Sequence, residues 1–61
     1  MTAEQEQAAE KVRAAFREKR SAFVYWKARW ILRQELPEIT SDELHSLASA
    51  LAREENQRRK S

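Results

Sequence analysis

The chain has 61 residues, with no cysteine, no glycine, one proline, one histidine and a formal net charge of +2 at pH 7. A chain of this length forms one domain at most and buries only a marginal hydrophobic core, so we expect a single domain over residues 1–61. The composition excludes disulfides and thiolate metal sites, disfavours a zinc site, and the modest net charge disfavours a dedicated nucleic-acid binder.

A first helix is predicted over about residues 3–36, because nothing in this range breaks a helix and its residues are mostly good helix formers. Pro37 ends this helix, since the residue before a proline is pushed out of the α region. The alternative is a break near Ser21 that lets residues 3–19 fold back as a third helix. The long helix is preferred because no Gly, Pro, Asn or Asp marks a tight turn there.

Within this helix, residues 23–32 carry four of the five aromatic residues and are apolar on most of the circumference. Trp26 and Trp30 are interpreted as core residues on one stripe with Phe23, Val12 and Phe16. Tyr25 and Ile31 lie off that stripe and are expected to be exposed contact residues, with two arginines at the edge. The predicted protein-binding residues are Tyr25, Arg29, Ile31 and Arg33.

A second helix is predicted over about residues 41–57, with the last residues, 57–61, frayed. Thr40 and Glu43 have the spacing of a capping box, in which the threonine side chain caps the helix. An apolar stripe at helical spacing follows. Its members are Leu44, Leu47, Ala48 and Leu51.

The two helices together predict an all-α antiparallel hairpin, because the connection around Pro37 is short. The second helix covers the first only back to about Arg20, which leaves Val12 and Phe16 without cover from the same chain. A second copy could supply that cover. We therefore expect a homodimer that forms a four-helix assembly.

Catalytic chemistry has little support in the sequence. Asp42, His45 and Ser49 share one helical side, but a working triad also needs oxyanion donors and a sheltered pocket. A solvated polar face is the preferred interpretation. We expect no enzymatic activity, no cofactor, and no catalytic or metal-binding residues.

Nucleic-acid binding is a second possibility. Arg13, Arg17 and Arg20 recur at helical spacing and Lys27 continues their side, as in a stripe that follows phosphates. Residues 34–56 are strongly acidic, however, which favours pairing within the protein. The sequence carries no targeting signal and no apolar run that spans a bilayer, so a cytoplasmic protein without a membrane partner is expected.

The preferred function is a small regulatory protein-binding module, a modulator or inhibitor of a larger protein, of bacterial or phage type. It rests on the surplus of apolar surface and on the absence of catalytic apparatus. The alternative is a nucleic-acid-binding helical dimer that uses the basic stripe.

Overall fold

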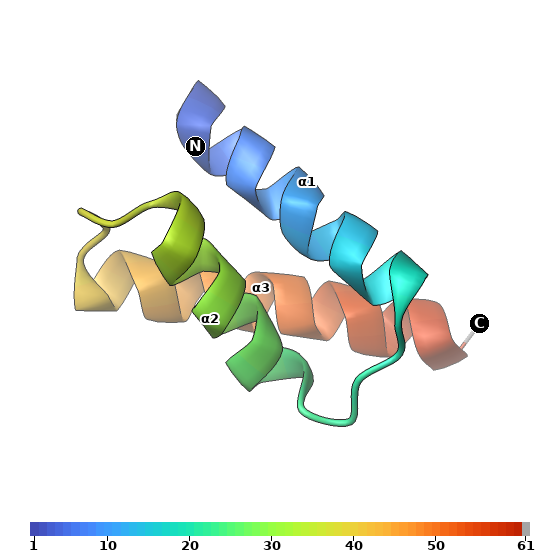
Figure 1. The fold of residues 1–61 in the computed structure, drawn as a ribbon. Helices are drawn as coiled ribbons and strands as arrows, with labels where there is room; N and C mark the ends of the chain where they lie inside the picture. Colours follow the sequence, from blue (N-terminus) through green and yellow to red (C-terminus); the bar gives the residue numbers. More distant parts are fainter. Residues whose placement is uncertain (61) are drawn as a thin grey trace.

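The computed structural model describes residues 1–60, which form three α-helices and no strand (Figure 1). The helices are α1, Ala3–Glu18, α2, Val24–Glu35, and α3, Ser41–Lys60. Each helix packs against the other two. The predicted all-α class is confirmed, whereas the two-helix hairpin is wrong, because the helix expected over residues 3–36 is interrupted.

The ends of the helices follow local signals in the sequence. Thr40 caps α3 as predicted, since the Glu43 backbone N–H donates to Thr40 Oγ1 at 3.2 Å, an interaction that contributes about 1 kcal/mol. Pro37 lies just beyond the end of α2, also as predicted. The third helix continues to Lys60, past the predicted end at residue 57, and Ser61 lies outside the described residues.

The interruption has a geometric reason. In one continuous helix at about 100° per residue, Phe16 and Ala28 would point about 120° apart. Separating α1 from α2 lets the apolar sides of both helices face one core, where Phe16 is 4% exposed and Ala28 is 0% exposed. The bend lies in residues 19–23, which we call the connection. Burial of apolar surface therefore outweighs the helical preference of the connection.

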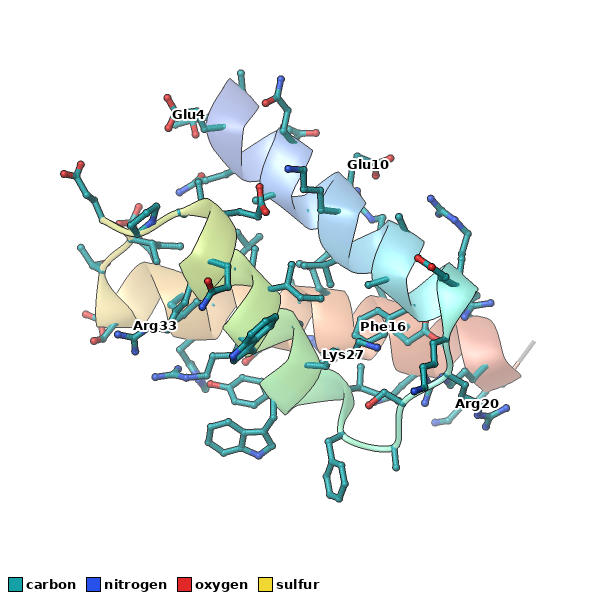
Figure 2. The ribbon with its side chains drawn as sticks, viewed as in Figure 1. Glu4, Glu10, Phe16, Arg20, Lys27 and Arg33 are labelled. Carbon is teal, nitrogen blue, oxygen red and sulfur yellow. The ribbon has the colours of Figure 1, made fainter. Side chains whose placement is uncertain are left out.

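The core includes Val12 and Phe16, the two residues for which the sequence predicted no cover within the chain. Val12 is 0% exposed, and Phe16 lies between α1 and α3 (Figure 2). The prediction that these two side chains lack cover within the chain is wrong. A homodimer stays a prediction, but this observation no longer motivates it.

The core contains several alanines, and these let the helices approach closely. Its members are Ala8, Ala9, Val12, Phe16, Val24, Ala28, Leu32, Leu44, Ala48, Leu51 and Ala52. Among residues 1–60, none of the helices combines the length and the apolar character that crossing a bilayer would require.

Candidate functional site

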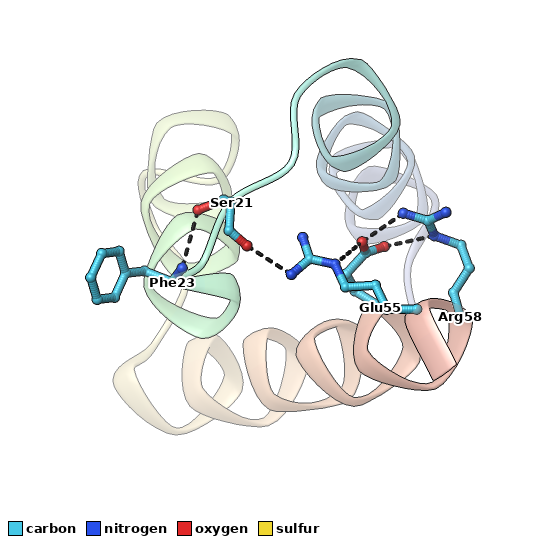
Figure 3. Close-up of polar contacts among 5 residues, drawn as sticks. Ser21, Phe23, Glu55 and Arg58 are labelled. Atoms are coloured by element: carbon cyan, nitrogen blue, oxygen red, sulfur yellow. Dashed lines mark hydrogen bonds and ion pairs between the residues drawn. The ribbon is translucent and has the colours of Figure 1, made fainter. Parts of the chain in front are cut away.

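The outer side of α2 exposes three aromatic rings. Phe23, Trp26 and Trp30 are 72%, 63% and 66% exposed, and Phe23 points away from all three helices (Figure 3). Trp26 and Trp30 lie four residues apart on one side of α2, and Phe23 is the residue directly before the helix. We call this surface, together with Lys27 and Arg33 beside it, the aromatic-basic face.

The opposite side of α2 is the one that packs. Val24, Ala28 and Leu32 are buried at i, i+4, i+8 against the core. The prediction that Trp26 and Trp30 belong to the core is therefore wrong. The break at the connection removes the stripe that was expected to run from Val12 through these two rings.

Two of the predicted contact residues are also placed differently from expectation. Tyr25 and Ile31 are half-buried and pack against the core, so the expectation that both are exposed is wrong. Arg33 is exposed on the aromatic-basic face. Whether Tyr25, Arg29, Ile31 and Arg33 bind a protein stays a prediction.

Trp26 is held in place by its neighbours. The Arg29 guanidinium lies 5.9 Å from the centroid of the Trp26 ring, within cation–π range, and Tyr25 packs edge-on against the same ring with centroids 5.1 Å apart. Arg29 Nη1 also donates to the Tyr25 hydroxyl at 3.2 Å. These contacts orient Trp26 although most of its surface meets water.

The Tyr25 hydroxyl also connects α2 to α3. It forms a hydrogen bond with His45 Nδ1 at 2.9 Å, whose direction is set by the imidazole tautomer, and it also accepts from Arg29. Among residues 1–60 no hydrogen bond joins His45 to Asp42 or Ser49. The three polar residues that superficially resembled a triad are therefore not connected as one.

The aromatic-basic face carries positive charge that the protein does not neutralise. From Lys19 to Gln34 the chain has five basic residues and no acid. In the described part of the chain neither Lys27 nor Arg33 forms an ion pair, while other cations do, as when Lys11 Nζ lies 2.7 Å from Glu35 Oε1. Apolar rings on this face are therefore flanked by unpaired cations.

The basic stripe predicted for nucleic acid is divided by the fold. Arg13 and Arg17 lie on α1, Arg20 on the connection and Lys27 on α2, so the four do not follow one helix. Arg13 lies 2.7 Å from a Glu54 oxygen and 2.6 Å from a Glu10 oxygen.

The pairing changes the pKa of Arg13 and of Glu54. Hydrogen bonds to Glu54 and Glu10 raise the pKa of Arg13 above its ordinary value, and the same guanidinium lowers the pKa of Glu54. Arg13 is thus engaged within the domain. A nucleic-acid role for the four residues stays a prediction.

An ionic cluster around one buried carboxylate, which the sequence did not predict, lies at the end of α3. Glu55 is only 5% exposed. Its Oε2 atom accepts a hydrogen bond from Arg58 Nη2 at 2.6 Å and another from Arg59 Nε at 2.7 Å (Figure 3). Arg59 Nη1 also donates to the Ser21 backbone oxygen at 2.8 Å. The i, i+3, i+4 spacing of the three α3 residues was the available signal. The cluster fixes the connection to α3.

Hollows in the surface lie away from the aromatic-basic face. One of about 400 Å³ opens where the start of α1 meets the segment around Pro37, and another of about 410 Å³ opens between Met1 and α3. None of the three exposed rings lines either hollow. Among residues 1–60, no group of three or more His, Asp or Glu side chains is arranged to hold a metal ion.

Comparison with known proteins adds no relative. No protein family, no curated protein and no solved structure matches this chain. Function is therefore inferred from the residues and their geometry.

Proposed function

We propose that this protein is a small protein-binding module, a modulator or inhibitor of a larger protein, that docks through the aromatic-basic face of α2. The observation that carries the proposal is the exposure of Trp26 and Trp30 one turn apart on α2, with Phe23 exposed at the start of the same helix. Single exposed apolar residues are ordinary on protein surfaces, whereas adjacent large ones mark interaction sites. Tryptophan and arginine also supply much of the binding energy at interfaces.

The shape and charge of the face specify the partner's chemistry. Trp26 and Trp30, one turn apart on a convex helix with Phe23 at its start, fit an apolar groove, the arrangement used when one helix docks into another protein. The unpaired charges of Lys27 and Arg33 favour carboxylates along the edge of that groove. A symmetric contact with a second copy through this face would instead bring those cations together, which disfavours self-association there.

The test is capture from an extract of the source organism, identification of the bound protein, and titration with that protein in pure form. Trp30→Ala should weaken binding by roughly 2 kcal/mol or more, about thirtyfold, while helicity and oligomeric state stay unchanged. Reversing Lys27 and Arg33 to Glu should slow association and reduce its dependence on salt. Arg17 is an exposed cation on α1, outside the aromatic-basic face. Arg17→Glu is therefore the matched control, and it should leave the rate of association nearly unchanged.

Two outcomes would contradict the proposal. One is a partner that binds the Trp30→Ala variant as tightly as the unchanged protein. The other is steeply salt-dependent binding of a labelled single-stranded oligonucleotide that requires Trp26, Trp30 and Lys27. That result would assign the face to nucleic acid, because aromatic rings and cations also stack on and attract unpaired strands.

A further inference from the structure

The connection between α1 and α2 bends without containing a residue that requires a bend. Residues 19–23 include no Gly, Pro, Asn or Asp, and no described residue has a positive φ. Lys19, at φ −146° and ψ 122°, is in an extended conformation open to any residue. Left to local preference, this segment would continue α1 into α2. The bend is therefore imposed by contacts with the rest of the domain.

The decisive contacts occupy backbone groups that a continuous helix would use. In such a helix the Ser21 carbonyl would accept from the Tyr25 N–H, and the Phe23 N–H would donate to the Lys19 carbonyl. Instead, Arg59 Nη1 donates to the Ser21 oxygen at 2.8 Å, and the Phe23 N–H donates to Ser21 Oγ at 3.2 Å. These two hydrogen bonds replace helical ones at the bend (Figure 3).

The Arg59 contact is incomplete. Its side chain is 15% exposed and is anchored by Nε on Glu55 at 2.7 Å. Its Nη2 atom, however, is buried without a hydrogen-bond partner. An unsatisfied buried donor carries a desolvation cost, so the guanidinium stabilises the bent form less than a fully hydrogen-bonded guanidinium would.

We propose that the chain has a second folded form, a domain-swapped dimer in which residues 3–35 make one helix. In this form α1 of each copy packs on α2 and α3 of the other. The occupant must be a second copy, because in a continuous helix Phe16 and Ala28 point about 120° apart and α1 cannot return to its own core. The pocket that covers Val12 and Phe16 is identical on the second copy, so the same apolar contacts re-form.

The exchange uses the inner side of α2. Trp26 and Trp30 lie largely exposed on the other side of this helix, so the dimer presents these two rings twice, whereas Phe23 belongs to the connection that changes conformation. Such a pair could raise avidity for a partner with two sites. The swap nevertheless stands on the connection and Arg59, and it is independent of the proposed function.

Arg59→Ala tests the swap, with Arg58→Ala as matched control. Both arginines bond Glu55, but Arg58 is 54% exposed on its side chain and only Arg59 is bonded to the connection. Losing the Arg59 contact penalises the bent form alone. The dimerisation constant from sedimentation equilibrium should therefore rise about tenfold or more, equivalent to about 1.4 kcal/mol, whereas Arg58→Ala should leave it nearly unchanged.

A proline in the connection should have the opposite effect on dimerisation. Ala22→Pro, combined with Arg59→Ala, should return the protein to monomer because proline interrupts a helix interior. Circular dichroism establishes that the variant folds. Ala22→Gly serves as a second variant with a smaller effect in the same direction, since glycine disfavours helix without blocking it.

Cross-linking identifies the dimer as swapped. The ion pair between Lys11 Nζ and Glu35 Oε1, 2.7 Å apart, joins α1 to α2, and a carbodiimide converts it to an amide. In dimer prepared from mixed ¹⁴N and ¹⁵N protein, this cross-link should join chains of different label. A dimer whose Lys11–Glu35 links stay within one label would overturn the proposal. So would monomer for Arg59→Ala throughout the millimolar range.

Discussion

Leu32→Ala should unfold the domain, whereas Trp30→Ala should leave it folded. Leu32 is 0% exposed on the inner side of α2, and truncating such a leucine costs about 2–5 kcal/mol. A core this small provides only about 3–5 kcal/mol in total. Trp30 is two-thirds exposed, so its loss should change the free energy of unfolding by roughly 0.5 kcal/mol.

Thermal denaturation followed by circular dichroism compares the two variants directly. Both substitutions introduce alanine, the best helix former, so differences in helix propensity are small beside the difference in burial. The opposite order, with Trp30→Ala unfolded and Leu32→Ala close to wild type, would place the rings in the core. It would restore the long helix over residues 3–36.

Glu55→Gln should be the next most damaging change, and its effect should depend on pH. Hydrogen bonds from Arg58, and then from Arg59, lower the pKa of Glu55 from its usual 4.5, against the opposing effect of burial. A folded pKa below the unfolded one stabilises the protein above pH 4.5, and this stabilisation is lost as the pH falls through the folded pKa. At neutral pH the substitution should cost about 1–3 kcal/mol.

Urea unfolding at about pH 7 and about pH 3 measures this dependence. The difference between wild type and Glu55→Gln should shrink at the lower pH, because below pH 4.5 proton uptake by the carboxyl of the unfolded wild-type chain favours unfolding. Glu54→Gln is the control, since Glu54 is 51% exposed and an ion pair at the surface contributes about 0–1 kcal/mol. A cost for Glu55→Gln that is equal at both pH values would contradict the role assigned to the cluster.

The features of this fold that follow from neighbouring residues could be predicted. Thr40 and Glu43 are three residues apart, and Pro37 acts on the residue before it, so both signals can be read locally. The bend at the connection depends instead on Arg59 and Ser21, which are 38 residues apart in the chain. No local pattern encodes that contact, and the sequence therefore favoured one long helix.

The same error decided which side of α2 was assigned to the core. A helix that is apolar on most of its circumference has no clear polar side, so its orientation depends on what precedes it. Extending the stripe from Phe16 selected Trp26 and Trp30, whereas the bend selects Val24, Ala28 and Leu32. The exposed rings therefore lie in the segment from which the sequence predicted contacts, but on the side of α2 that the sequence assigned to the core.

Tryptophan fluorescence tests the exposure of the aromatic-basic face most directly, because Trp26 and Trp30 are the only two tryptophans of the chain. In the folded protein their emission should resemble that of indole in water, and acrylamide should quench it nearly as well as it quenches free tryptophan. Blue-shifted emission protected from acrylamide in the folded monomer would contradict this result. It would place the rings inside the protein and remove the surface on which the proposed function depends.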